Sequence, residues 1–468
     1  MEKKADTKTK PFGIKDKIGY MFGDFGNDFT FIFASSFLMI FYTKVFGLSG
    51  ALVGAIFLVS RIIDAFIDIG MGRLIDTLKP AKDGRFRPWI RRISIPIVIS
   101  TVLMFLYVVE DWSYTARVIY AIVTYLIWGI LYSAINIPYG SMAAVLSTEA
   151  GDRAALSTFR SIGATLAGLV ISIITPLIIY TSDAAGNQVI ISRNFTILAV
   201  VYGGLSILGY ILCYRNCTER IQIEPSAQKA GQTNTFKVLL ANRALLALIG
   251  SALLLLLATL MAQTMNTYLF MDYFKNAKIL SVVGFVSTIA VLLVAPFAAK
   301  LSSRFGKKEL GSISVLFTSV IYFLLFILRV KSITVFMVLF FLAALGSSIF
   351  NVIVWAFITD VIDYQEVKTH QREDGTIYAV YSFARKFGQA LAGGIGGFAL
   401  TAIGYVSDAP SQTQEVEESI YVIATVFPAI AYLGVGLILF FVYPLSKKRV
   451  EENIAELKSR HKDKNNTK

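Results

Sequence analysis

The chain has few of the residues on which enzymes and disulfide-bonded proteins depend. Its 468 residues include two Cys, two His and only 16% charged residues, whereas a soluble domain carries about 25%. Two cysteines exclude a disulfide framework, and His370 and His461 leave little capacity for a metal centre or a Ser-His-Asp set. Cys213 and Cys217, one helical turn apart, are interpreted as small apolar fillers. The absence of a GxxxxGK[ST] loop argues against an ATP-driven pump.

Hydrophobic residues make up 55% of the sequence, which is more than one protein interior can bury. The class that remains is a membrane protein with many spans. Because a membrane-spanning helix needs about 20 mostly apolar residues, the apolar runs predict about twelve helical spans and an all-α fold. The approximate spans are 27–47, 50–72, 93–110, 116–145, 157–181, 195–214, 243–271, 279–299, 309–328, 333–360, 376–404 and 419–444. The runs are long and continuous, which excludes the short alternating strands of a β-barrel.

Positive charge is distributed unequally around these spans. Most of the 44 Lys and Arg residues fall in the two terminal tails and in the loops after every second span. The opposite loops contain only Lys44, Arg117, Arg193, Lys275, Lys278, Arg329 and Lys331. The positive-inside rule therefore predicts a plasma (inner) membrane protein with both termini cytoplasmic. The net charge of +13 is then a topology signal, not evidence for nucleic-acid binding. The charged N-terminal stretch lacks the features of a signal peptide.

The predicted spans divide into two sets of six. Residues 215–243 form the longest polar interruption, and the loops after the second and eighth spans are both short, basic and glycine-containing. This pattern predicts two parallel repeats, the plan of the major facilitator transporters, which bind substrate midway through the membrane between the halves. We expect an N-terminal six-helix bundle (1–214), a cytoplasmic middle loop (215–242), a C-terminal six-helix bundle (243–444) and a cytoplasmic tail (445–468).

Arg61, Asp64 and Asp68 fall inside the second span, where each charge costs about 2.5–3.5 kcal/mol on insertion scales. Their spacing places all three on one face of a helix. Two carboxylates one turn apart, with one arginine, leave a negative charge that requires a proton or a metal ion. A structural ion-pair ladder between helices is the alternative.

A second polar group lies at the start of the first predicted span, in the sequence GDFGNDFTF. Asp28 follows Asn27 there, and Asp24 lies one turn earlier. Three basic residues inside spans five and eleven are candidates for partners of these acidic residues or of the substrate. They are Arg160, Arg385 and Lys386. Their charges either pair with Asp28, bind an acid on a substrate, or form purely structural pairs.

Tyr132, Ser133 and Asn136 share a face of the fourth span, just before Pro138. A proline in a spanning helix frees a backbone carbonyl. The result is a polar spot suited to a hydroxyl-rich ligand, although a plain proline kink is the alternative. The aromatic residues that adjoin polar groups, and that therefore suit stacking on a sugar ring, are Tyr132, Tyr139 and Tyr381.

Asp360 and Asp363 lie at the end of the tenth span and not in its interior. They face the basic loop after the eighth span. We therefore expect them to form ion pairs of a cytoplasmic gate and not to bind a ligand.

Motifs along nearly the whole chain form a recognisable set. They are Gly19-Tyr20, Gly23-Asp24, Phe41-Tyr42-Thr43, Gly47-Leu48, Arg61-x-x-Asp64-Ala65-x-x-Asp68, Gly84-Arg85-Phe86-Arg87-Pro88-Trp89, Asn136-Ile137-Pro138-Tyr139-Gly140, Asp360-x-x-Asp363-Tyr364 and Arg385-Lys386-x-Gly388-Gln389-Ala390. Together they resemble the glycoside–pentoside–hexuronide cation symporters, a branch of the major facilitator superfamily. That family couples downhill entry of a cation to uphill uptake of a glycoside.

The resemblance implies two sets of functional residues. Asp64, Asp68, Ser133 and Arg61 are expected to form the cation-coupling site, with the two carboxylates as metal ligands if the cation is Na⁺. The residues expected to bind substrate are Asn27, Asp28, Tyr132, Asn136, Arg160, Tyr381, Ser382, Arg385 and Lys386. Ile67 stands where a sodium-using member of the family has an asparagine, which favours H⁺ over Na⁺. No cofactor besides this coupling ion is expected.

Departures from the family pattern bear on the substrate. Asn136 and Gly140 stand where a melibiose-transporting member has Asp and Trp, so the substrate is not expected to be melibiose. Arg385 beside Lys386 makes the pocket less negative, which suits a hexuronide or a neutral xyloside or glucoside. We expect a monomeric importer, surrounded by lipid, that takes a glycoside, disaccharide or oligosaccharide. A membrane enzyme lacks a catalytic set here, and a non-transporting sugar sensor on the same fold is the alternative.

Overall fold

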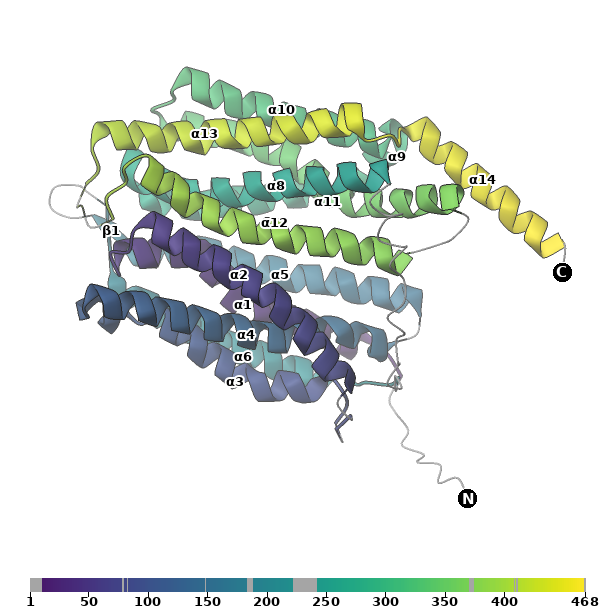
Figure 1. Cartoon of the computed structure of the whole chain (residues 1–468), viewed down its shortest axis with the longest axis horizontal. Helices are drawn as coiled ribbons and strands as arrows, with labels where there is room; N and C mark the ends of the chain where they lie inside the picture. Colours follow the sequence, from purple (N-terminus) through teal and green to yellow (C-terminus); the bar gives the residue numbers. More distant parts are fainter. Residues whose placement is uncertain are drawn as a thin grey trace. The chain divides into compact units, whose positions relative to one another are not determined.

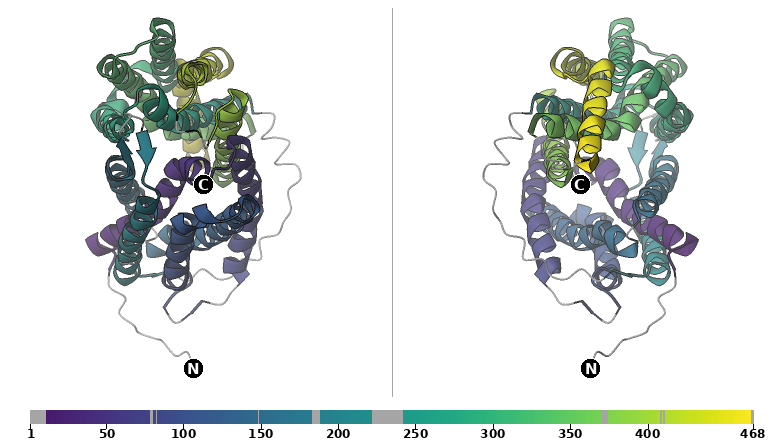
Figure 2. Two further views of the ribbon diagram at one scale, coloured as in Figure 1. Left: turned by 90° about the vertical axis from the view of Figure 1, so that its left-hand side faces the viewer. Right: turned by 90° about the vertical axis from the view of Figure 1, so that its right-hand side faces the viewer.

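The computed structural model describes residues 11–77, 80–81, 83–147, 149–182, 188–221, 242–369, 374–407, 409 and 411–466. The chain divides into two compact units (Figure 1). The first comprises residues 1–185 and 189–229, and the second comprises residues 186–188 and 230–468. Viewed end-on, most of the long helices within each unit are seen close to their axes (Figure 2).

Six long helices make up the first unit. They are α1 (Ile14–Lys44), α2 (Gly50–Thr77), α3 (Arg87–Met104), α4 (Tyr114–Leu146), α5 (Ala150–Ile179) and α6 (Ser192–Asn216), with a 3₁₀ turn η1 (Tyr107–Asp111). Two short strands, β1 (Tyr180–Ser182) and β2 (Gln188–Ile190), pair with each other just before α6. Helix α1 packs against α5 and α6, while α4 packs against α2 and α3.

Helices also form nearly all of the described second unit. They are α8 (Arg243–Tyr268), η2 (Leu269–Tyr273), η3 (Ala277–Ile279), α9 (Leu280–Phe305), α10 (Lys307–Leu328), α11 (Ile333–Thr369), α12 (Asp374–Ala402), α13 (Gln414–Leu437), η4 (Ile438–Val442) and α14 (Lys447–Asn466). Helix α8 packs between α12 and α13, and α10 packs against α11 and α13 (Figure 1). The Asn242 side chain caps α8 by accepting hydrogen bonds from the backbone N–H groups of Ala244 and Leu245, both at 3.0 Å.

Among the described residues, eleven helices are long and apolar enough to cross a membrane. Helix α12 corresponds to the eleventh predicted span but is not one of these eleven, and it carries Arg385 and Lys386. Many large apolar side chains are exposed, including Phe66 at 72% and Phe441 at 69%. Such a surface suits a lipid environment, because soluble monomers rarely expose large apolar patches.

Small residues let α1 approach its neighbours closely. A side chain at Gly163 of α5 would meet the backbone carbonyl of Met21, and a Cβ at Gly209 of α6 would lie 2.7 Å from the carbonyl oxygen of Phe22. In membranes such close backbone approach is a principal source of helix–helix packing. The region of α1 around residues 21–26 is therefore held firmly between α5 and α6.

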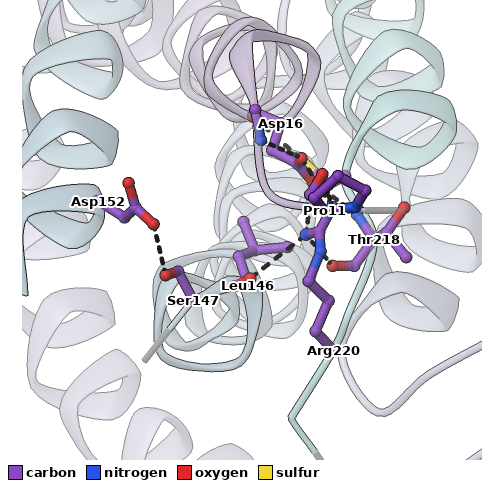
Figure 3. Close-up of polar contacts among 9 residues, drawn as sticks. Pro11, Asp16, Leu146, Ser147, Asp152, Thr218 and Arg220 are labelled. Carbon is purple, nitrogen blue, oxygen red and sulfur yellow. Dashed lines mark hydrogen bonds and ion pairs between the residues drawn. The ribbon is translucent and has the colours of Figure 1, made fainter. Parts of the chain in front are cut away.

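Helix α1 begins at Ile14, well before the predicted start at residue 27. The prediction followed the apolar run, but the polar first turns of α1 are stabilised by tertiary contacts. Arg220, just after α6, donates to both carboxylate oxygens of Asp16 at 2.9 Å (Figure 3). It also donates to three backbone carbonyls, those of Pro11, Leu146 and Thr218. Asp24, Asn27 and Asp28 consequently lie inside the helix and not at its start.

Glu219, in the same segment after α6, caps the start of α3. The Glu219 carboxylate accepts hydrogen bonds from the backbone N–H groups of Arg85, Phe86 and Arg87 at 2.7–2.8 Å. These donors belong to the first turn of α3 and the residues just before it, where backbone N–H groups have no partner within the helix. Gly84, with a φ of +120°, lies directly against this carboxylate. Residues 217–221 thus hold α1, α3 and α4 together at one end of the unit.

Candidate functional site

The first half of α1 forms an ion pair with α5. Arg160 donates through Nε to Oδ1 of Asp24 at 3.0 Å. The Asp24 side chain is 8% exposed, but that of Arg160 is 41% exposed. Asp28, one turn further along α1, forms no direct hydrogen bond or ion pair with any residue in the described part of the chain. The direct partner of Arg160 is therefore Asp24 and not Asp28, the partner that sequence reasoning considered.

Two stacked tyrosine rings, Tyr139 and Tyr20, pack against Arg160. Its guanidinium carbon lies 5.4 Å from the centre of the Tyr139 ring. Tyr139 stacks on Tyr20 with 4.6 Å between ring centres, and its hydroxyl donates to the Tyr20 carbonyl at 2.6 Å. Gly23 makes this possible, because a side chain there would collide with the Tyr139 ring. Tyr139 is fully buried, so it supports Arg160 and does not offer a free face to a sugar.

A polar chain links α1 to α6 and α4. The Tyr210 hydroxyl donates to Oδ1 of Asn27 at 2.7 Å, and Nδ2 of Asn27 donates to Oδ1 of Asn136 at 3.3 Å. Asn27 is 1% exposed. The amide nitrogen of Asn136 makes no hydrogen bond to another described residue, so it remains available as a donor. Asn27 thus links α1 to α6 and α4, whereas Asn136 still has an amide N–H group that can donate a hydrogen bond.

The acidic face of α2 is built around an arginine in an aromatic setting. Arg61 Nη1 lies 3.7 Å from Oδ2 of Asp64. The Arg61 guanidinium carbon lies 5.3 Å from the centre of the Phe31 ring and 5.9 Å from that of Trp128. Asp64 lies against Gly129 of α4, where a Cβ would collide with its carboxylate. An aromatic environment stabilises a guanidinium that is removed from water.

The remaining residues predicted for this part of the site lie on the same two helices, α2 and α4. Asp68 is half-buried one turn beyond Asp64, and Ser133 is 4% exposed on α4. Tyr132 stacks on Phe31 and Trp128, with ring centres 5.0 and 5.3 Å apart. Within the described ranges, no three or more His, Cys, Asp or Glu side chains are grouped closely enough to hold a metal ion.

In the second unit, α12 and α11 carry the other predicted residues. Tyr381 is fully buried, and the guanidinium carbon of Arg385, one turn further along α12, lies 6.0 Å from its ring centre. The side chains of Ser382 and Lys386 lie outside the described part of the structure. On α11, Asp360 pairs with Lys307 at 2.6 Å, and Asp363 is half-buried one turn further on.

Several residues of this site were not among the predicted site residues. Asp24 carries a detectable signal, since it lies four residues before Asp28 and so shares its helix face. The aromatic supports carry no such signal, because a buried aromatic residue in a span looks like ordinary packing. These supports are Tyr20, Phe31, Trp128 and Tyr210.

Comparisons with known proteins agree with this architecture. Residues 19–447 match the family described as MFS/sugar transport protein. An uncharacterized symporter of Bacillus subtilis, YjmB, is 34% identical over 452 residues, which cover 96% of each chain. A glucuronide carrier protein homolog of Escherichia coli is 30% identical over 450 residues, or 95% of each chain. The crystal structure of a bacterial homolog of the human lysosomal transporter Spinster is similar with a TM-score of 0.66 and 13% identity, covering 95% of this chain and 99% of that one.

The protein is therefore a multi-pass membrane transporter with the all-helical major facilitator fold, and it is not an enzyme. Within that superfamily, the chain belongs to the MFS/sugar transport family, the glycoside–pentoside–hexuronide cation symporters. The fold class and the family predicted from the sequence are confirmed.

Proposed function

We propose that the protein imports a glycoside, disaccharide or short oligosaccharide by symport with a cation, H⁺ in preference to Na⁺. It acts as a monomer in the plasma (inner) membrane, with both termini cytoplasmic. Its working parts are the bundles 1–214 and 243–444. Support comes from family membership and from the unequal distribution of Lys and Arg around the spans.

The observation that carries the proposal is the Asp24–Arg160 pair with Asp28 one turn away, on a helix long enough to cross a membrane. Charged groups inside spans are costly and usually serve transport. A carboxylate accepts and a guanidinium donates hydrogen bonds in fixed directions, which suits neighbouring sugar hydroxyls. The spare amide of Asn136 adds a further donor. We infer that Asp28, Arg160 and Asn136 contact the substrate.

The acidic face of α2 supports a cation-coupling site formed by Asp64 and Asp68, with Ser133 as a further oxygen and Arg61 as counter-charge. A proton needs a single carboxylate, whereas Na⁺ needs several oxygen ligands at defined positions. Ile67, between the two acids, supplies no oxygen. The proposed order of preference, H⁺ before Na⁺, follows from this shortage.

Coupling requires that the loaded states reorient unequally. A carrier that is empty, or that holds both cation and sugar, should reorient readily, and a carrier that holds the cation alone should reorient slowly. Each ligand can shift this balance only by its difference in affinity between states.

The test begins with a panel of glycosides screened for protection of the purified protein against thermal unfolding. A protecting sugar is then added to de-energised cells in sodium-free buffer, and the proposal expects the medium to become more alkaline. If no protons are taken up and sodium restores transport, the preference for H⁺ is wrong. If sugar binds but neither accumulation nor counterflow of labelled sugar occurs, the protein is a sensor and not a carrier.

A further inference from the structure

Three aromatic rings from α1 and α4 lie nearly parallel to one another beside Arg61. Phe31 on α1 stacks on Tyr132 and Trp128 of α4, with ring centres 5.0 and 6.3 Å apart and ring planes inclined by 24° and 16°. Trp128 and Tyr132 stack on each other at 5.3 Å and 19°. We call this set the ring stack. The Arg61 guanidinium, from α2, lies over the Phe31 and Trp128 rings of this stack, at 5.3 and 5.9 Å from their centres.

Arg61 is held more loosely by its acidic neighbour than Arg160 is. Arg61 Nη1 lies 3.7 Å from Oδ2 of Asp64, which is beyond hydrogen-bond distance, whereas Arg160 Nε lies 3.0 Å from Oδ1 of Asp24. The Arg61 side chain is nevertheless only 20% exposed. A guanidinium that is largely removed from water is stabilised by the faces of aromatic rings. The ring stack therefore contributes substantially to holding Arg61 in place.

Trp128 has one feature that packing alone does not explain. The residue is 1% exposed, and its indole Nε1–H group is buried without a hydrogen-bond partner among the described residues. An unpaired buried donor costs free energy, and a phenylalanine would supply a buried ring without that cost. Tryptophan, however, is the side chain whose ring face attracts a cation most strongly. The residue type at this position is therefore explained by the face that it offers to Arg61.

The ring stack also reaches residues that are proposed to contact the substrate. Tyr132 is among the residues expected to bind substrate, and Asn136 follows it one turn later on α4. Phe31 lies three residues after Asp28 on α1, so the two side chains share a helix face. Contiguous packed side chains of this kind can carry energetic coupling between two sites. One end of the stack thus adjoins the proposed sugar site, and Arg61 at the other end belongs to the proposed cation site.

We propose that Phe31 and Trp128 are positioning residues that link the binding of sugar to the binding of the coupling cation. They hold Arg61 in place beside the acids of α2, and a sugar that contacts Tyr132 fixes the ring stack in turn. This inference rests on the proposed function and adds how its two sites communicate. Without the ring faces, the position of Arg61 no longer depends on the sugar, and the two ligands bind independently of each other.

The experiment compares two modes of transport in the same membrane vesicles. The probe is the radiolabelled methyl β-glucoside, β-xyloside or β-glucuronide that the wild type exchanges fastest. Accumulation against a gradient requires coupling to the cation, whereas exchange of labelled for unlabelled sugar requires only the sugar site and reorientation. The ratio of the two does not depend on how much folded protein the vesicles contain.

Trp128→Leu and Phe31→Leu should each lower accumulation about tenfold and leave exchange close to the wild-type rate. A tenfold change corresponds to about 1.4 kcal/mol, which lies within the range of cation–π contacts that are shielded from water. Trp128→Phe retains a ring face and should retain most of the accumulation. This rescue separates the effect of the ring face from that of a general loss of packing.

A double variant and a matched control complete the design. Arg61→Lys keeps the charge but loses the planar group that stacks on the rings, so it should resemble Trp128→Leu, and the two changes together should cause no further loss. The control is Phe195→Leu, because Phe195 is an equally buried ring of the same unit, stacked on Phe105 at 6.0 Å. It should lower the unfolding temperature and leave the ratio of accumulation to exchange unchanged.

The results distinguish this inference from the proposed function. If Trp128→Leu lowers accumulation and exchange in equal proportion, the ring only packs, and the inference is wrong while symport stands. Equal losses in Trp128→Phe and Trp128→Leu, or additive losses in the double variant with Arg61→Lys, would also overturn it. If the wild type neither exchanges nor accumulates any of the three glycosides, the proposed function fails and this inference fails with it.

Discussion

Helix α1 carries two aspartate–arginine pairs about two turns apart, and they differ in how completely the arginine is used. At Asp16, Arg220 makes at least five hydrogen bonds, two to the carboxylate and three to backbone carbonyls. At Asp24, Arg160 makes one, through Nε. The arginine with more hydrogen bonds is also the less exposed one: the Arg220 side chain is 15% exposed and that of Arg160 is 41% exposed.

The difference indicates which pair is structural. A buried charge is tolerated when its donors are matched. Both Nη groups of Arg220 have acceptors, and these bonds connect α1, α4 and the segment after α6. Neither Nη group of Arg160 has an acceptor among the described residues, and its side chain is 41% exposed, so solvent or a ligand can reach these donors. Under the proposed function, the same amino-acid pair thus stabilises the fold at one position and supports binding at the other.

The largest expected effect comes from breaking the saturated pair. Arg220→Ala leaves the Asp16 carboxylate buried without its partner and removes bonds to three carbonyls. Removing one partner of a buried pair costs about 3–5 kcal/mol. We expect a large fall in the unfolding temperature of the purified protein, measured by differential scanning fluorimetry in detergent.

Arg160→Ala is the companion variant. Because Arg160 is 41% exposed and makes a single bond, its removal costs one contact, but it leaves the Asp24 carboxylate, 8% exposed, without its partner. We expect a smaller loss of stability than for Arg220→Ala, together with loss of sugar binding. Equal losses of stability in the two variants would contradict the distinction between a structural and a functional pair.

A second large effect concerns the acids of α2. Asp68→Asn removes the carboxylate without a large change in shape, so accumulation of sugar against a gradient should be abolished. Exchange of labelled for unlabelled sugar needs no net movement of the cation and should persist. Both are measured in the same vesicles. Normal accumulation in this variant would remove Asp68 from the coupling site.

The sequence predicted the helices and the family better than it predicted the contacts within the site. Apolar runs located the spans, but several helix ends differ from the predicted bounds, as in α11, which continues from 360 to Thr369. The largest difference is at α1, whose polar first turns depend on Arg220 far away in sequence. The charged residues of α1, α2 and α5 stood out because charges in spans are rare. The choice of Asp24 over Asp28 as partner of Arg160 depends on the approach of α5 to α1 at Gly163, which no local pattern encodes.

A smaller effect is expected from replacing Lys386, which is among the residues expected to bind substrate. A lysine is a point charge without a paired donor edge. Lys386→Gln should therefore reduce affinity for a glucuronide several-fold more than for the matching glucoside. Competition against a labelled sugar in vesicles measures both affinities. Equal losses for the two sugars would indicate that Lys386 serves coupling or structure instead.

The smallest expected effect concerns the number of oxygen ligands that α2 offers to a cation. Ile67 lies between Asp64 and Asp68 and offers no oxygen, so the proposed α2 site lacks one ligand that would favour Na⁺ but that a proton does not need. Ile67→Asn adds an amide oxygen. Uptake by this variant should gain a few-fold stimulation by sodium that the wild type lacks, and proton-driven uptake in sodium-free buffer should remain. If sodium stimulates the wild type and Ile67→Asn equally, the identity of the residue at position 67 does not set the choice of cation. The control is Ile67→Val, which alters packing without adding an oxygen and should show no sodium response.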